Sequence, residues 1–214
     1  MPAKGRFQRT RIKMCGLTRK QDVEAAIFAG TDALGFVLWS GSKRAITPQQ
    51  LADLTAGLPP FVSRVGLFVD ADMALIEQCA PYLDAVQFHG NEAPKACVRV
   101  NIPWFKAIRM QEGVDVIERA HMYEKGAALL LDAYHPGVPG GTGATFDWQR
   151  VPVDSHLPVI LAGGLHANNV GEAISRVRPY AVDVSGGIES SPGIKCATRM
   201  QAFVRAVRQA DDAH

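Results

Sequence analysis

A thiol and a carboxylic acid each end an apolar segment, and together they could exchange protons with a substrate. Cys15 ends the run Ile12–Cys15, and Asp132 ends the leucine-rich run Ala128–Asp132. An acid after such a run loses hydration, which favours its protonated form and suits a general acid. Lys13 points to the same side of an extended segment as Cys15, and a nearby ammonium favours a thiolate. The pair predicts acid–base chemistry, although Asp132 could instead cap a helix or lie in a loop, and a cysteine is usually a small buried apolar residue.

Two glycine pairs could hold an anion. Gly163 and Gly164 follow one apolar run, and Gly186 and Gly187 follow the next. Backbone N–H groups approach an anion closely only where no side chain blocks them. A single pair would mark only a tight turn, but two pairs after the last two apolar runs favour a phosphate site.

Arg44 and His89 could complete a binding site. Arg44 stands in the stretch WSGSKRAITP, and its planar guanidinium suits a carboxylate or a phosphate. His89 ends the run AVQFH. Taken singly, Arg44 would be an ordinary surface arginine and His89 a hydrogen-bonded core histidine, so their importance depends on the fold.

The elements that must position these residues alternate along the chain. Apolar runs that are β-branched or continuously apolar, as strands buried on both faces are, recur eight times. They span 12–16, 33–38, 64–69, 85–90, 104–109, 128–133, 158–164 and 181–187.

Helical segments are expected between these runs. Thr18 begins a capping-box pattern, and Gly30 ends that helix; Thr47 with Pro48 begins a second helix, which Gly57 ends. Further helices are expected over 114–125, 167–178 and 192–210, and over 71–80 and 92–100.

Eight strand–helix units predict an α/β fold, a compact single-domain (β/α)8 TIM barrel over residues 1–214, with residues 1–10 as a basic N-terminal tail. An open doubly wound sheet is the alternative, but no G-x-G-x-x-G follows the first run. In a barrel the strand ends share one mouth, where Cys15, Arg44, His89, Asp132 and both glycine pairs would meet. The first and last strands would also adjoin, so Lys13 is expected to pair with Asp183.

Composition limits the possible partners. A formal net charge of +2 over 214 residues gives no reason to expect nucleic acid as a partner. No apolar run reaches the ~18 residues of a membrane span, and no signal peptide is recognised, so we expect a cytoplasmic protein without membrane contact. The four cysteines are scattered, as reduced thiols are, and predict neither disulfides nor a metal site. No feature assigns an oligomeric state.

The chain resembles the phosphoribosylanthranilate isomerase family of tryptophan biosynthesis almost from end to end. The stretches that carry the resemblance are KMCGLTRKQD, GTDALGFVLWSGSKR, VQFHG, LLLDA, GGTGATFDW, LAGGLHANNV and VDVSGGIESSPGIK. SGSKR replaces the family's more usual serine-proline-arginine, which puts the rigidity of that loop in question.

The resemblance implies an Amadori rearrangement of N-(5-phosphoribosyl)anthranilate, a small-molecule substrate, to 1-(2-carboxyphenylamino)-1-deoxyribulose 5-phosphate, with no cofactor or metal. It implies that Asp132 is the general acid and Cys15 the general base. It also places the carboxylate-binding arginine at Arg44, active-site residues at His89 and Asp183, and phosphate binding at the loops of Gly164 and Gly187.

Three alternatives compete with this interpretation. A histidine-pathway isomerase uses two aspartates, whereas the first strand here ends in cysteine. A metal-dependent epimerase needs several histidines and carboxylates at strand ends, and here only His89 clearly qualifies. A non-catalytic phosphometabolite-binding module has no reason to keep both Cys15 and Asp132.

The Gly- and Pro-rich stretch after Asp132 is long for a loop and could form a lid.

Overall fold

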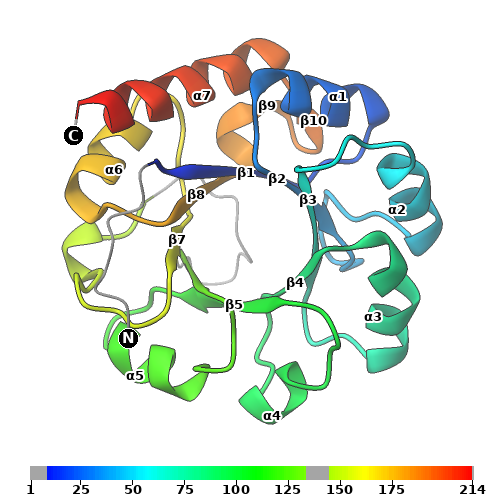
Figure 1. Cartoon of the computed structure of the whole chain (residues 1–214), viewed down its shortest axis with the longest axis horizontal. Helices are drawn as coiled ribbons and strands as arrows, with labels where there is room; N and C mark the ends of the chain where they lie inside the picture. Colours follow the sequence, from blue (N-terminus) through cyan, green and yellow to red (C-terminus); the bar gives the residue numbers. More distant parts are fainter. Residues whose placement is uncertain (1–8, 134–144, 214) are drawn as a thin grey trace.

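A closed barrel of parallel strands forms the centre of the molecule. The computed structural model describes residues 9–133 and 145–213. Within them, eight strands pair in chain order from β1 to β8, and β1 pairs with both β2 and β8. This closure confirms the predicted barrel and excludes the open sheet. Figure 1 shows the helices as an outer ring around the strands.

Each predicted apolar run overlaps one observed strand, and two of the strands, β1 and β3, begin one residue earlier than predicted. The runs are buried because their residues face either the barrel interior or the surrounding helices. The strands are β1 (Arg11–Cys15), β2 (Ala33–Val37), β3 (Ser63–Phe68), β4 (Ala85–Phe88), β5 (Trp104–Arg109), β6 (Leu129–Asp132), β7 (Val159–Leu161) and β8 (Ala181–Val184).

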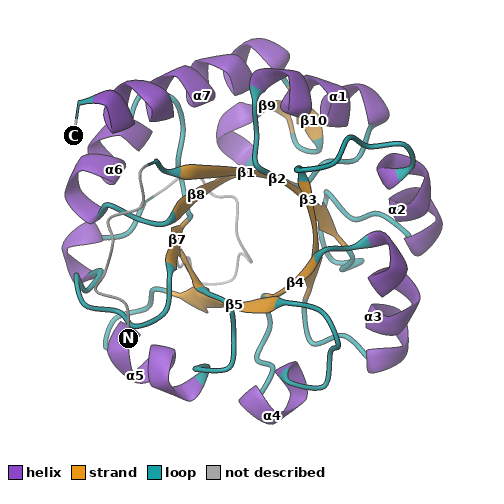
Figure 2. Cartoon of the chain, in the orientation of Figure 1, coloured by secondary structure: helices purple, strands orange, loops and turns teal. Residues whose placement is uncertain are grey.

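The helices are mostly shorter than the sequence predicts (Figure 2). The α-helices are α1 (Lys20–Ala29), α2 (Pro48–Thr55), α3 (Met73–Cys79), α4 (Pro94–Cys97), α5 (Val116–Met122), α6 (Val170–Val177) and α7 (Ala197–Asp212). The described residues also form the 3₁₀ turns η1 (Ala80–Tyr82), η2 (Trp148–Arg150) and η3 (Gly186–Ile188).

The caps predicted at Thr47 and Gly30 are confirmed, whereas α2 ends at Thr55 with Ala56 as its C-cap, one residue before the predicted Gly57. Thr47 and Gln50 form a capping box on α2, and Gly30, at φ 94°, ends α1 with its N–H on the carbonyls of Ala26 and Ile27. The capping box predicted at Thr18 is wrong. Its hydroxyl instead donates to the carbonyl of Gly193 at 2.8 Å, so a distant loop takes the group that would have capped the helix.

The last predicted helix begins later than expected, and a hairpin occupies its first residues. The strands β9 (Glu189–Ser191) and β10 (Ile194–Lys195) pair antiparallel across Pro192 and Gly193. Gly193 adopts φ 82°, a left-handed conformation that suits a turn and not a helix. The hairpin matters for function because it carries Glu189 and Lys195 to the barrel mouth.

The barrel interior is apolar toward its amino-terminal end and polar toward its carboxyl-terminal end. Val65, Phe105, Leu130 and Ile160 belong to one buried interior cluster. Lys13 is also buried, at 4% exposure, and lies two residues before Cys15 on the inner face of β1. A buried ammonium needs a partner of opposite charge, and Asp183 on β8 is that partner.

The chain start is partly docked on the barrel. Thr10 is buried, and its backbone N–H and its hydroxyl both donate to Asp211, while Arg9 pairs with Asp32. These two residues therefore belong to the folded barrel, and residues 1–8 of the predicted tail lie outside the described residues.

Most of the predicted lid, residues 134–144, also lies outside the described residues. In the described part of the chain, no helix combines the length and apolarity that a membrane span requires.

Candidate active site

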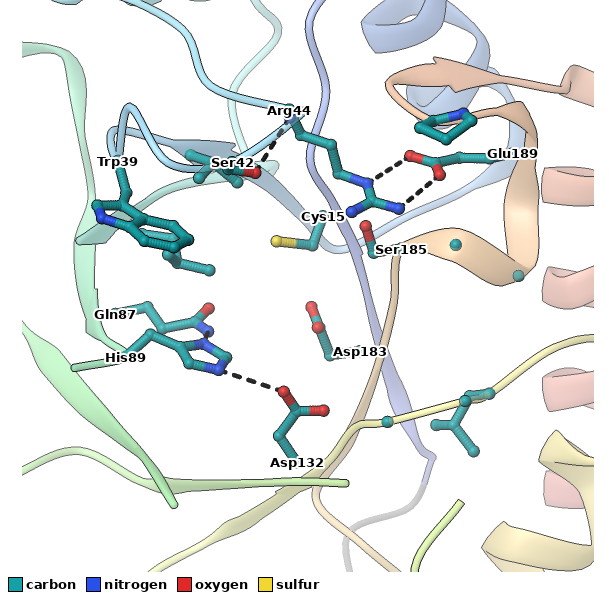
Figure 3. A pocket seen from close by; sticks show the side chains of 18 of the residues that line it. Cys15, Trp39, Ser42, Arg44, Gln87, His89, Asp132, Asp183, Ser185 and Glu189 are labelled. Atoms are coloured by element: carbon teal, nitrogen blue, oxygen red, sulfur yellow. Dashed lines mark hydrogen bonds and ion pairs between the residues drawn. The ribbon is translucent and has the colours of Figure 1, made fainter. Parts of the chain in front are cut away.

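One cavity of about 450 Å³ opens at the carboxyl ends of the strands. This volume fits a small-molecule ligand. The cavity brings together every residue that the sequence singled out for the site. Its lining includes Cys15, Arg44, His89, Asp132, Gly163, Gly164, Asp183, Gly186 and Gly187. Figure 3 shows Cys15, Asp132 and Asp183 directed into the same space from β1, β6 and β8.

Lys13 and Asp183 form an ion pair beside Cys15, as the sequence predicts. Lys13 Nζ lies 2.6 Å from Asp183 Oδ1, and the two side chains are only 5% and 11% exposed. Gly35 on β2 makes room for this arrangement, because a Cβ there would lie 2.7 Å from the Cys15 sulfur and 3.0 Å from Lys13 Nζ. The small residue on one strand thus lets the thiol and the ammonium approach each other.

Burial governs the protonation of Cys15. Burial raises the pKa of the Cys15 thiol, and the Lys13 ammonium offsets only part of that rise. For Lys13 itself, burial would lower the pKa, but the charges of Asp183 and Cys15 outweigh it and the pKa is raised. Lys13 therefore favours the thiolate without making it the resting form.

Asp132 is held by a short chain of polar groups. His89 Nε2 lies 3.2 Å from Asp132 Oδ2, and His89 Nδ1 lies 2.9 Å from Gln87 Nε2. If the Gln87 amide donates to Nδ1, the proton of a neutral His89 is on Nε2 and points at Asp132. Gln87 Oε1 is buried without a hydrogen-bond partner among the described residues. These two contacts fix the ring of His89 and orient the carboxyl group of Asp132.

The two glycine pairs form adjoining loops, and side chains are excluded where these loops approach other parts of the backbone. A Cβ on Gly163 would lie 2.3 Å from the amide nitrogen of Ala133, and one on Gly187 would lie 2.0 Å from the carbonyl oxygen of Leu165. Gly164 has φ 64°, and its carbonyl accepts from the amide of Asn169. Loops after β7 and β8 that expose backbone N–H groups are suited to an anion.

Arg44 forms an ion pair with another side chain at the cavity mouth, that of Glu189. Its Nε and Nη2 each donate to a carboxylate oxygen of Glu189, and both distances are 2.7 Å. Glu189 also lines the cavity. Arg44 therefore reaches the mouth as predicted, but as half of a bidentate ion pair.

Sequence analysis missed several lining residues. Arg109 ends β5 and lines the cavity, so the rule that strand ends form the site would have found it. Trp39, Leu67 and Val69 give the cavity an apolar wall near Cys15. Glu189 has no such signal, because its main partner, Arg44, is 145 residues away in the chain. Among the described residues, no group of three or more His, Cys, Asp or Glu side chains could hold a metal ion.

Comparisons with known proteins identify the family to which this site belongs. The family model described as "N-(5'phosphoribosyl)anthranilate (PRA) isomerase" matches residues 12–206. The chain belongs to this family. A relative from Chromohalobacter salexigens, named N-(5'-phosphoribosyl)anthranilate isomerase, is 58% identical over 201 residues, which cover 94% of this chain and 95% of the relative.

Solved structures of phosphoribosyl anthranilate isomerases share the fold. The crystal structure of the enzyme from Thermotoga maritima has a TM-score of 0.86 and 38% identity, and the match covers 94% of this chain and 99% of that one. Another has a TM-score of 0.80 and 36% identity over the same shares, and is a complex with reduced 1-(o-carboxyphenylamino)-1-deoxyribulose 5-phosphate. Membership of the isomerase family decides against the histidine-pathway, epimerase and non-catalytic alternatives, and makes the chain an isomerase of tryptophan biosynthesis.

Proposed function

We propose that this chain converts N-(5'-phosphoribosyl)anthranilate to 1-(2-carboxyphenylamino)-1-deoxyribulose 5-phosphate, with Asp132 as general acid and Cys15 as general base. The observation that carries the proposal is that both side chains point into one cavity whose mouth also holds two glycine loops and Arg44. The substrate needs the same set of groups, because it has a phosphate, a carboxylate and a proton-transfer centre between them.

The proposed reaction begins at the ribose ring oxygen. Asp132 donates its proton to that oxygen while the anthranilate nitrogen supplies electrons, and the ring opens to an iminium. Cys15, as thiolate, then removes the proton on C2′, which the cationic imine has acidified. The resulting enolamine gains a proton at C1′ and loses the hydroxyl proton at C2′, which gives the ketone. One proton leaves the acid and one arrives at the base, so the product is an isomer of the substrate.

The raised pKa of Cys15 limits the amount of thiolate available for the proton abstraction. In the empty site burial favours the thiol. Formation of a cationic imine beside the sulfur adds a second positive charge to that of Lys13, and opposite charges favour a thiolate. The thiol of Cys15 must first lose its proton to solvent, and the charges of Lys13 and of the cationic imine then favour the thiolate that accepts the proton from C2′.

The anionic ends of the substrate would lie at different parts of the cavity. We place the phosphate on the backbone N–H groups of Gly163, Gly164, Gly186 and Gly187, and the carboxylate at Arg44. The anthranilate ring would lie against the apolar wall formed by Trp39, Leu67 and Val69. His89 and Asp183 would orient Asp132 and Lys13 respectively. We expect the enzyme to act in the cytoplasm on this small molecule.

The activity is tested by supplying phosphoribosylanthranilate to the purified protein and following the loss of its anthranilate-type fluorescence. We expect turnover without an added metal or cofactor, and the same rate after treatment with a chelator. No loss of fluorescence with a correctly folded protein would refute the proposal.

A further inference from the structure

The guanidinium of Arg44 has one edge bound and another edge free. Nε and Nη2 hold the two oxygens of Glu189, and the two side chains are 17% and 5% exposed. Nη1 makes no hydrogen bond within the part of the chain that the structure describes. In Figure 3 the guanidinium lies beside Cys15, and Glu189 holds it from the side away from the cavity centre.

Glu189 is itself fixed from several sides. Lys195 Nζ donates to its Oε1 at 2.8 Å, and the amide of Gly193 donates to the same oxygen at 3.2 Å. The Lys195 side chain is fully buried and also donates to the carbonyl of Ser185 at 3.1 Å. Burial would raise the pKa of Glu189, but the hydrogen bonds from Arg44 and the charge of Lys195 outweigh it and lower the pKa. Glu189 is therefore a rigid, ionised anchor.

Arg44 reaches this anchor by crossing the end of β1. Gly16, at φ 76°, follows Cys15, and a Cβ there would lie 2.5 Å from Arg44 Cδ. The arginine stem thus passes directly over the backbone next to the catalytic thiol. The position of the Arg44 side chain therefore depends on the absence of a side chain at Gly16 and on its two hydrogen bonds to Glu189.

We propose that Glu189 is a positioning residue that holds Arg44 so that its free edge meets the anthranilate carboxylate. This inference rests on the proposed function, in which Arg44 binds that carboxylate. A guanidinium can bind two carboxylates along different edges, because its five N–H donors have a fixed planar geometry. A side chain held on one edge loses less conformational freedom when it binds a second carboxylate.

A purely electrostatic role for Glu189 predicts the opposite effect. Glu189 is one anion between two cations, Arg44 and Lys195. If it only neutralised their charge, its removal would leave more positive charge at the mouth and would tighten the binding of an anionic ligand. A positioning role predicts weaker binding when Glu189 is changed, even where the charge is conserved.

Glu189→Asp is the decisive variant, because it keeps the charge and withdraws the carboxylate by about 1.5 Å, one C–C bond. The ligands are the reduced product analogue 1-(o-carboxyphenylamino)-1-deoxyribulose 5-phosphate and its counterpart without the carboxyl group, with Kd measured by calorimetry. We expect Glu189→Asp to raise Kd about tenfold for the carboxylated ligand, the scale of one charge-assisted hydrogen bond, and to leave the other Kd unchanged. Glu189→Gln should shift the same ratio in the same direction.

A matched control exists at the opposite end of the barrel. Arg64 binds Asp84 through Nε and Nη2 at 2.9 and 2.7 Å, the same bidentate geometry on the surface. Asp84→Asn should change neither Kd. An equal loss for both ligands, or unchanged or tighter binding of the carboxylated ligand by Glu189→Asp, would overturn the positioning role.

The Arg44→Ala variant separates this inference from the proposed function. We expect Arg44→Ala to lose affinity for the carboxylated ligand selectively. If it does so and Glu189→Asp does not, only the role of Glu189 is refuted. If Arg44→Ala shows no selectivity, the proposed carboxylate site itself is wrong, and the inference falls with it.

Discussion

The ammonium of Lys13 lies 2.6 Å from the carboxylate of Asp183, and this ion pair joins the first strand of the barrel to the last. In the strand register these two residues are direct partners. The pair therefore compensates a buried charge at the seam where the barrel closes. It also holds a positive charge beside Cys15, which links closure of the fold to the chemistry of the thiol.

Lys13→Met should raise the pKa of Cys15 further. In the native protein burial already raises the pKa, so the thiolate forms as the pH rises above the range of an exposed cysteine. Without the ammonium, the midpoint should move to still higher pH. The measurement is the pH dependence of iodoacetamide alkylation at Cys15, resolved from the other cysteines by peptide mass spectrometry. Superimposable curves would reject the electrostatic role of Lys13.

The same substitution should also destabilise the fold, because Asp183 would remain buried without its partner. Breaking a buried ion pair costs roughly 3–5 kcal/mol of unfolding free energy. The double variant Lys13→Met with Asp183→Leu removes both charges and should recover much of the loss in a urea titration. No recovery would indicate that the destabilisation comes from packing.

Cys15→Ser and Asp132→Asn should each fold normally and lose most of kcat. General acid or base catalysis contributes about 10²–10⁴-fold, so losses of at least that order are expected. The assay is the fluorescence decrease described above, with circular dichroism as the check on folding. Turnover close to wild type in the folded Asp132→Asn protein would remove Asp132 from the mechanism.

Gly16→Ala should weaken substrate binding and not simply slow the chemistry. Its Cβ would meet Arg44 Cδ at 2.5 Å, and the positive φ would be strained in addition. Displacement of Arg44 should raise KM for phosphoribosylanthranilate by about ten- to a hundredfold, the range expected for the loss of a charge-assisted hydrogen bond. Gly57→Ala is the control, because Gly57 also has a positive φ, 70°, and no atom lies within 4 Å of the Cβ position. A similar rise of KM in both variants would point to backbone strain and not to Arg44.

The barrel and most of its mouth could be predicted because both depend on local patterns. Apolar runs predict the strands, and a parallel barrel then brings every strand end to one side. The Pro192–Gly193 hairpin was missed because a helix pattern and a turn signal overlap there. Glu189 could not be assigned a role because its contacts depend on the hairpin. The effect of Lys13 on Cys15 could be predicted because the lysine is close in the sequence, whereas the burial that raises the pKa of the thiol depends on the fold.

Gln87→Met should change catalysis more than stability. The amide has one hydrogen-bonded end, at His89, and one buried oxygen without a partner in the described structure. Methionine has a similar volume and removes both, so a lost hydrogen bond of about 0.5–1.5 kcal/mol is offset by relief of an unpaired buried group that costs about 1–3 kcal/mol. We therefore expect an unfolding free energy between about 0.5 kcal/mol below and about 2.5 kcal/mol above wild type, since these two terms oppose each other.

The same variant should lower kcat, because His89 loses the neighbour that orients its ring toward Asp132. A free Nδ1 allows His89 to change its tautomer and its contact with the acid. His121→Gln is the control, because His121 lies on α5, outside the cavity lining. A Gln87→Met protein with the wild-type kcat would show that Asp132 keeps its orientation without the Gln87–His89 contact.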